Sequence, residues 1–261
     1  MSVRFIYSNF EKKLITLGID TGTPDGKVLT SNVNNVTSLD VSYSNITNLS
    51  GLEAFTSLTS LKCYGNYTLT ALDVRKNTKL TTLDCNNNYL VTTLDVSQNT
   101  ALTYLNCYSN KLTTLDVSNN KNLTTLQCAS NKLTSLNVAN NKALTKLDLG
   151  YNLISSLDVS QNKELTSLTC TSNQISNLDI SLNTKLIELW AGNNLYTALD
   201  VSNNTALTSL ICNTNQLTTL DVSRNTALTR LLIYKNKITN IDVSNNTLLS
   251  SFDCNSNLIT N

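Results

Sequence analysis

Apolar residues recur along the chain with a period that is too long for a helix or an ordinary strand. The segment L-x-x-L-x-C-x-x-N-x-L returns about every 21 residues, and the earliest steps are slightly longer than the later ones. The first copy begins at Val36, and the later copies begin at Leu58, Leu80, Leu102, Leu123, Leu144, Leu165, Leu186, Leu207, Leu228 and Leu249. Eleven copies in one register, the last of them incomplete, indicate stacked repeats.

Each repeat has two halves. In the first half, apolar and other residues alternate around x-L-x-C, which predicts a short strand with Leu and Cys facing inward and the residues between them facing outward. Such strands stack in parallel at about 4.8 Å. The second half typically reads L-D-V-S-x-N-x-x-L. One repeat cannot bury its own apolar face, so we expect stacking to bury it.

Asparagine occupies one fixed position in each half. We expect these side chains to satisfy peptide groups at the corners of each coil and to bridge to the next coil, because an amide both donates and accepts. The first column is Asn66, Asn88, Asn110, Asn131, Asn152, Asn173, Asn194, Asn215, Asn236 and Asn257, and the second is Asn77, Asn99, Asn120, Asn141, Asn162, Asn183, Asn204, Asn225 and Asn246.

The first half matches the leucine-rich repeat template, with Cys in place of the third Leu. We predict an α/β-type, mostly β solenoid, which is a right-handed leucine-rich repeat horseshoe with a parallel concave sheet. The cysteine half is the preferred concave strand because it keeps the N-x-L spacing of the template. The L-D-V-S half also fits the template and is the alternative choice for the concave strand. A three-sided β-helix is the alternative fold.

Residues 1–35 do not fit the repeat and are predicted to form an N-terminal cap for the solenoid of residues 36–261. The spacing of Phe10, Leu14 and Leu17 predicts a short amphipathic helix that starts at an N-cap Ser8 and stops at Gly18. The following segment, DTGTPDGK, is predicted to be a loop. No comparable segment closes the other end, so we expect the chain to be part of a longer protein.

The seven cysteines all fall at the inward position of the first half. Other repeats place Val41, Leu149, Ala191 and Ile233 there, so the position calls for a small apolar side chain. An odd number cannot pair completely, and parallel Cβ directions suit disulfides badly, so we predict a column of buried thiols with no metal or cofactor. A soft-metal site is the less favoured alternative. The cysteines are Cys63, Cys85, Cys107, Cys128, Cys170, Cys212 and Cys254.

A row of aspartates follows the first Leu of the second half. We predict that hydrogen bonds to nearby Ser, Thr or backbone groups offset the repulsion between stacked like charges. A cation-binding stripe is the alternative. The row is Asp73, Asp95, Asp116, Asp158, Asp179, Asp200, Asp221 and Asp242.

The outward residue before the cysteine position varies between repeats and is therefore free for recognition. Three consecutive repeats place Trp190, Ile211 and Leu232 there. An apolar column that faces water often marks a contact site, although local packing can also cover it. We predict a partner-binding site on this column with a polar rim made of Glu188, Arg230, Tyr234 and Lys235.

A second candidate group of aromatic residues lies nearer the N-terminus. Five tyrosines are expected to project from three adjacent repeats onto the concave sheet, where they suit protein or glycan contacts. They are equally consistent with ordinary exposed residues. The group is Tyr64, Tyr67, Tyr89, Tyr104 and Tyr108.

Composition argues against several functions. The chain has no His, which removes the commonest general base, and it has no Gly-rich phosphate loop, so we predict no enzyme activity. A net charge of +1 with no basic patch predicts no nucleic-acid partner. No apolar run approaches the roughly 20 residues of a membrane span, so we predict no membrane insertion.

The repeat consensus LTxLxCxxNxLTxLDVSxNTxL resembles the cysteine-ladder repeats of internalin J-like proteins and of secreted bacterial repeat proteins more widely. The resemblance covers nearly the whole chain, although no signal, wall anchor or C-terminal cap is visible. It implies a secreted or cell-surface module that binds a protein or carbohydrate ligand on its concave face. A structural spacer that holds another domain away from the cell surface is the alternative, and ice binding is a more distant one.

Overall fold

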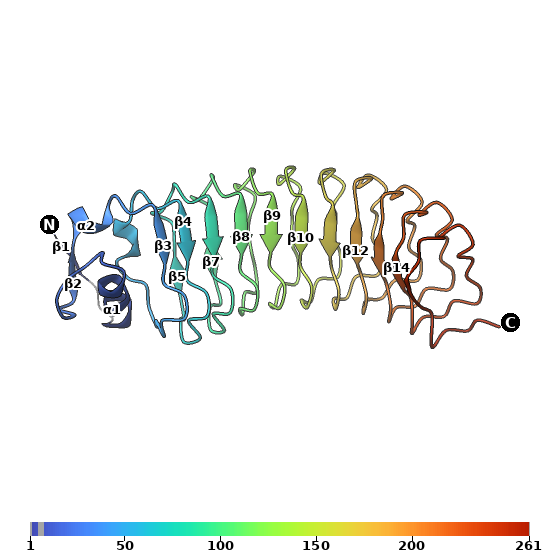
Figure 1. Ribbon diagram of the computed structural model, residues 1–261, viewed down its shortest axis with the longest axis horizontal. Helices are drawn as coiled ribbons and strands as arrows, with labels where there is room; N and C mark the ends of the chain where they lie inside the picture. The colour runs from blue at the N-terminus through green and yellow to red at the C-terminus, as the bar shows by residue number, and fades with distance from the viewer. Residues whose placement is uncertain (1, 5–7, 261) are drawn as a thin grey trace. The chain divides into compact units, whose positions relative to one another are not determined.

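The computed structural model describes residues 2–4 and 8–260. The chain forms two compact units, residues 1–132 and residues 133–261, which we describe separately. Parallel strands and loops dominate both units, and the helices lie in the first unit among the described residues (Figure 1).

The first unit opens with a cap of two strands and two short helices. Strand β1 (Ser2–Arg4) pairs antiparallel with β2 (Lys27–Leu29), and helices α1 (Ser8–Thr16) and α2 (Thr30–Val33) accompany them. The cap is therefore richer than the predicted helix and loop. Three-residue strands and a four-residue helix are too short to leave a periodic signal in the sequence.

Helix α1 forms where the apolar spacing predicts it. Phe10 and Leu14 are fully buried, whereas Leu17, the third residue of the predicted apolar spacing, is 42% exposed. The helix ends at Thr16 and Gly18 turns away with φ +70°, so Leu17 lies beyond the buried face. The proposed capping side chain of Ser8 lies outside the described side chains.

A buried carboxylate ties the helix to the loop that follows it. Glu11 is 1% exposed, and its carboxylate accepts the N–H groups of Asp25 at 2.7 Å and Gly26 at 3.0 Å. Asn9 donates its Nδ2 to the carbonyl oxygen of Asn45 at 2.8 Å, which fixes the helix to the first coil. The Glu11 bonds thus hold the cap together, whereas the Asn9 bond and the stacking of Phe10 on Phe55, with ring centroids 6.3 Å apart, join it to the first coil.

Coils of the solenoid complete the first unit. Their cysteine halves form one parallel sheet in which equivalent leucines are register partners, such as Leu61 and Leu83. The sheet consists of β3 (Ser38–Asp40), β4 (Ser60–Lys62), β6 (Thr82–Asp84), β8 (Tyr104–Asn106) and β9 (Thr125–Gln127). The 3-10 helix η1 (Leu52–Ala54) and the short parallel pair β5 (Leu72–Asp73) and β7 (Leu94–Asp95) lie in the second halves.

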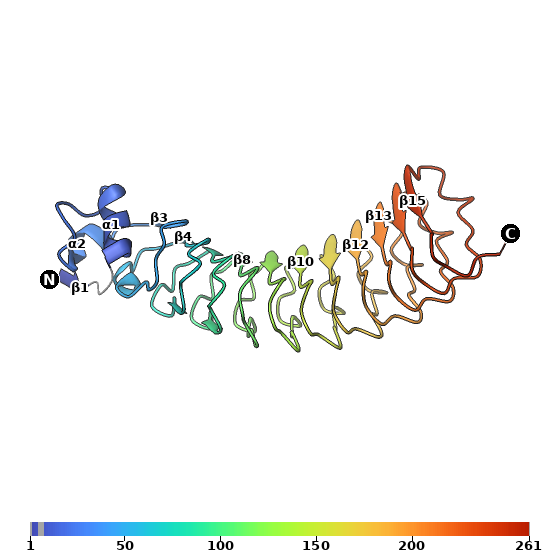
Figure 2. The same cartoon turned by 90° about the horizontal axis from the view of Figure 1, so that it is seen from below.

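The second unit is built entirely from coils. Its parallel sheet contains β10 (Lys146–Asp148), β11 (Ser167–Thr169), β12 (Glu188–Trp190), β13 (Ser209–Ile211), β14 (Arg230–Leu232) and β15 (Ser251–Asp253). These strands line the inner side of the bend of this unit (Figure 2). The preference for the cysteine half as the concave strand is therefore confirmed. The L-D-V-S half forms strands only at β5 and β7 among the described residues, which does not fit a three-sided β-helix.

The cysteines line the interior as predicted, and none of the seven forms a disulfide. Six are at most 2% exposed, whereas Cys254 is half-buried because no coil of this chain packs over it. Burial raises the pKa of Cys63, Cys85 and Cys107, and it raises the pKa of Cys170 to about 11 and that of Cys212 to about 12. The interior is thus dry enough to hold the thiols in their neutral form.

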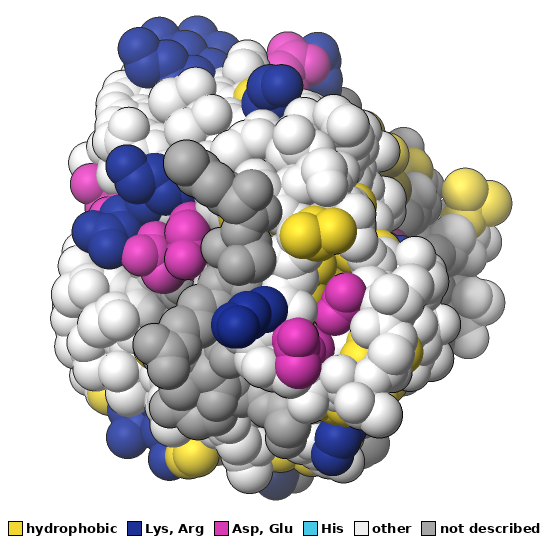
Figure 3. Space-filling model, turned by 90° about the vertical axis from the view of Figure 1, so that its left-hand side faces the viewer, with side chains coloured by type: hydrophobic (Ala, Val, Ile, Leu, Met, Phe, Trp, Pro, Cys, Tyr) yellow, Lys and Arg dark blue, Asp and Glu magenta, His cyan; other side chains and the backbone are white. Residues whose placement is uncertain are grey.

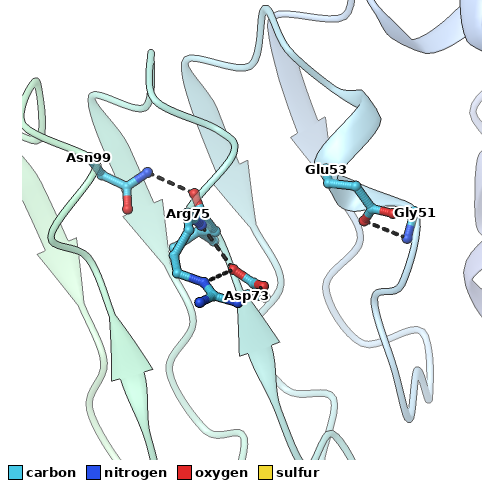
Figure 4. Close-up of polar contacts among 6 residues, drawn as sticks. Gly51, Glu53, Asp73, Arg75 and Asn99 are labelled. Atoms are coloured by element: carbon cyan, nitrogen blue, oxygen red, sulfur yellow. Dashed lines mark hydrogen bonds and ion pairs between the residues drawn. The ribbon is translucent and has the colours of Figure 1, made fainter.

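The asparagine columns connect successive coils by hydrogen bonds. In the first column, Asn66 donates Nδ2 to the carbonyl of Cys63 in its own coil and to that of Val41 in the preceding coil, while its Oδ1 accepts the N–H of Ile46. In the second column, Asn99 donates Nδ2 to the carbonyl of Val74 at 2.9 Å (Figure 4). The predicted bridging between coils is confirmed for both columns. The predicted acceptor role is not met at Asn99, whose buried Oδ1 accepts no hydrogen bond from the described residues.

One coil departs from the consensus in two positions at once. Tyr196 stands where neighbouring coils have Leu or Ile and is fully buried, and Ala191 replaces the cysteine of the same coil. The Tyr196 hydroxyl lies 3.5 Å from the Sγ of Cys170 in the preceding coil. Burial, and to a smaller extent Cys170 and Cys212, raises the pKa of Tyr196. Its contact with Cys170 and the small side chain of Ala191 lead us to infer that the hydroxyl occupies the gap left in the cysteine column.

We expect thiol reactivity to separate Cys254 from the other cysteines. At pH 8 in native buffer, an aromatic disulfide reagent should modify Cys254 rapidly and the remaining thiols only after unfolding, because buried thiols with a raised pKa form almost no thiolate. Cys254→Ser should abolish the rapid phase. As the pH rises past the unfolded thiol pKa of about 8.5, stability should fall, since only unfolded thiols ionise there. Rapid modification of several thiols would contradict a dry interior.

Substitutions at Ala191 and Tyr196 should be coupled. Tyr196→Leu leaves a cavity and Ala191→Cys overpacks the coil, so each should cost about 1–3 kcal/mol in urea unfolding. The double variant restores the consensus coil and should be at least about 1 kcal/mol more stable than the sum of the single changes predicts. The reciprocal pair in the next coil, Cys212→Ala with Leu217→Tyr, is the matched control. If the losses in unfolding free energy of the two single variants simply add in the double variant, Tyr196 does not fill the space beside Ala191.

Candidate binding surfaces

Three outward side chains form a continuous apolar column on the sheet of the second unit. Trp190 and Ile211 are register partners, as are Ile211 and Leu232, so the three lie side by side on β12, β13 and β14. Their strand neighbours Leu189 and Leu210 are fully buried, which forces these three outward. We call this set the Trp190 column.

The Trp190 column is accessible to a partner. Trp190 is 39% exposed, and Ile211 and Leu232 are half-buried. The column ends in polar residues, since Thr169 is the register partner of Trp190 on one side and Asp253 that of Leu232 on the other. An apolar strip three strands wide, with polar ends, is the arrangement that the sequence predicts.

The predicted rim residues divide into two places. Glu188 and Arg230 are exposed, begin β12 and β14, and lie in one row with Ser209 between them. The hydroxyl of Ser167 donates to the Oε2 of Glu188 at 3.2 Å. In the turn after β14, Tyr234 is half-buried and Lys235 is exposed with φ +55°. The column is thus flanked by charged side chains on one side and by this turn near its Leu232 end.

The structure divides the predicted tyrosine group. Tyr67 and Tyr89 stack with ring centroids 5.2 Å apart, but they lie in turns after the strands and not on the sheet face, so that expectation is corrected. Tyr64 also lies in a turn. Tyr104 lies on the sheet face in β8, where its hydroxyl contacts the Oε1 of Gln127 at 3.0 Å. Tyr108 lies in a turn and is 41% exposed.

Tyr43 belongs to the same aromatic cluster, and the sequence analysis missed it. Its ring centroid lies 5.1 Å from that of Tyr64 and 6.5 Å from that of Tyr67. It occupies the turn position two residues after the inward Val41, where Gly65 and Asn87 stand in the next two coils. Comparing turns position by position across the repeats is the signal that could have found it.

The aspartate row serves the turns of the second half, as predicted. The Oδ1 of Asp158 accepts the N–H of Ser160 at 2.8 Å, and bonds from Ser160 lower the pKa of Asp158. Asp73 likewise accepts the N–H of Arg75 at 3.0 Å, and it also forms an ion pair with the Arg75 guanidinium at 2.7 Å (Figure 4). A shallow hollow of about 480 Å³ lies over Asp73, Asp95 and Asp116 in the first unit. These carboxylates already accept bonds from their own turns, so the hollow is not a preformed cation site.

The charged side chains of the described residues are mixed in sign on the face seen in Figure 3, and they form no metal-ligand cluster. On the face that Figure 3 shows, Lys and Arg side chains are interspersed with Asp and Glu. In residues 2–4 and 8–260 no cluster of three or more Cys, Asp or Glu side chains is placed to hold a metal ion. No helix in that part of the chain is long and apolar enough to span a membrane.

Comparison with known proteins gives structural likenesses only. No protein-family model matches the chain, and no curated protein matches it in sequence. The functional domain of InlJ from Listeria monocytogenes, which includes a cysteine ladder, superposes with a TM-score of 0.82 at 38% identity and covers 98% of this chain. A leucine-rich repeat protein from Leptospira interrogans superposes with a TM-score of 0.78 at 26% identity over 87% of the chain.

These matches cover only part of each similar protein. The chain spans 62% of the length of the InlJ chain and 62% of the Leptospira chain. A plant peptide hormone receptor, RGFR1 in complex with RGF2, superposes with a TM-score of 0.59 at 20% identity. The match covers 72% of this chain and 38% of the receptor chain, and at this identity it shows the fold alone. By its repeat, its column of inward cysteines and these likenesses, the chain has the leucine-rich repeat fold and is similar to internalin J.

Proposed function

We propose that this chain is a non-enzymatic binding module that recognises a protein partner through the Trp190 column. The observation that carries the proposal is the alignment of Trp190, Ile211 and Leu232 on three adjacent strands. The inward residues of these strands, Leu189, Leu210 and Leu231, are buried in the core. The outward row is under no such requirement and is free to vary for recognition. The same position carries polar side chains in the neighbouring strands β11 and β15.

The energetics support a contact of useful strength. A buried aromatic side chain removes about 150–250 Å² from water, and about 25 cal/mol per Å² then yields several kcal/mol before association costs. Glu188 and Arg230 beside the column supply opposite charges that can orient a partner. A desolvated aromatic anchor with a polar rim is the usual composition of an interface hot spot.

Several features favour binding over catalysis. The sequence has no His, which removes the commonest base. Burial raises the pKa of interior thiols such as Cys212, which leaves them almost no thiolate. The leucine-rich repeat fold occurs in a peptide hormone receptor bound to RGF2, so the fold can hold a peptide partner. We also propose a secreted or cell-surface location, which the similarity to internalin J supports.

Trp190→Ala should weaken partner binding without unfolding the protein. A phage-displayed random peptide library selected on the wild-type chain should enrich sequences with aromatic or aliphatic side chains. Tryptophan-free versions of these peptides should bind Trp190→Ala at least tenfold more weakly in calorimetric titration, because the central anchor is lost. They should also shift the fluorescence of Trp190, which is the single tryptophan of the chain.

Tyr151→Ala is the matched control, since Tyr151 is an aromatic residue in the second unit, 61% exposed and outside the column. Its peptide affinities and thermal midpoint should match those of the wild type, and the midpoint of Trp190→Ala should stay close to both. Peptides that bind Trp190→Ala as tightly as the wild type would show that the column is not the binding site. If no peptide is enriched, the spacer role becomes the better account.

A further inference from the structure

The aromatic cluster of the first unit forms a surface of its own. The rings of Tyr64, Tyr43, Tyr67 and Tyr89 contact one another in that order, with centroid separations of 5.1, 6.5 and 5.2 Å. Tyr43 is 64% exposed, Tyr67 47% and Tyr89 46%. We call these four residues the tyrosine platform.

The backbone below the tyrosine platform leaves room for it. In these turns the residue two positions after the inward side chain has positive φ, and it is Tyr43 in the first coil, Gly65 in the second and Asn87 in the third. The first turn has a second such residue, Asn45. A Cβ atom at Gly65 would overlap the ring of Tyr43, so the ring lies directly over this glycine. Later turns place Ser109 and Ser130 at the same position. The positive φ alone does not require glycine, because Asn and Ser adopt it in neighbouring coils. Glycine is required at position 65 because the Tyr43 ring leaves no room for a Cβ atom.

The turns that carry the platform are uncharged. Residues 42–45, 64–67 and 86–89 contain no Lys, Arg, Asp or Glu, and their other members are Ser, Gly and Asn. The next two turns instead carry Lys111 and Lys132 at the position of Tyr67 and Tyr89. A charged ligand would find no counter-charge within these turns, whereas a neutral ligand rich in hydroxyl groups would find phenol and amide partners.

We propose that the tyrosine platform binds an uncharged oligosaccharide. The C–H faces of a pyranose ring can pack on tyrosine rings, whose faces carry partial negative charge. The phenol hydroxyls can exchange hydrogen bonds with sugar hydroxyls, and the Oδ1 of Asn87 can accept one. The Asn86 amide already donates to the Oδ1 of Asp84 and accepts the Nδ2 of Asn87. This inference goes beyond the proposed peptide-binding function and uses a different surface. A proline-rich peptide is the competing occupant, and such peptides prefer aromatic-lined grooves over a platform with rings as exposed as these.

The test is a titration with defined neutral sugars. Isothermal calorimetry with cellohexaose, chitohexaose, maltohexaose, laminarihexaose, mannohexaose and N-acetyllactosamine should detect binding of at least one of them to the full chain. The variant Tyr67→Ala/Tyr89→Ala should weaken that binding at least tenfold. Gly65→Ser should also weaken it with little loss of stability, because the neighbouring turns tolerate serine there while the new side chain displaces Tyr43.

Controls separate this proposal from the preceding one. Tyr108→Ala, an exposed tyrosine of the same unit, and Trp190→Ala should both leave sugar affinity unchanged. The sugar proposal fails if no sugar in the panel binds, if binding survives Tyr67→Ala/Tyr89→Ala, or if a proline decamer binds the platform in place of the sugars. None of these results affects the Trp190 column, which is judged by peptide binding to Trp190→Ala.

Discussion

A single coil of this chain cannot bury its own apolar side chains, and the rest of the structure follows from that constraint. Each coil turns leucines and a small apolar residue inward, and the next coil covers them. The corners leave peptide groups that must be paired, and the asparagine columns pair them across coils, as Asn66 does between Cys63 and Val41. Apolar stacking and polar pairing thus act between the same neighbours.

The same constraint decides where recognition is possible. Inward positions are occupied by Leu, Val or Cys in nearly every coil, and the corner positions by Asn. Outward strand positions and turn positions have no such requirement, so their side chains differ from coil to coil. The Trp190 column uses the strand positions of one unit, and the tyrosine platform uses the turns of the other.

Most of the repeat could be predicted from the sequence, because its signals are periodic. The strands, the cysteine column and the role of the asparagines all follow from spacing, and Trp190 pairs with Ile211 because the two residues stand one repeat apart. Features that occur once could not be predicted this way. Leu17 fits a helical period but lies beyond the last helical turn, and strand β1 is too short to show alternation. Tyr43 was missed because ring contacts depend on turn geometry, which the strand pattern does not encode.

The most direct test of shared stacking is amide hydrogen exchange in Asn194→Ala. The Oδ1 of Asn194 accepts the N–H of Ile175 from the preceding coil, and its Nδ2 donates to the carbonyls of Cys170 and Ala191. The account predicts faster exchange at Ile175 and through both coils, with a loss of about 1–3 kcal/mol in stability, because buried groups on each side lose their partner. Faster exchange confined to the coil that contains the substitution, with Ile175 as protected as before, would contradict it.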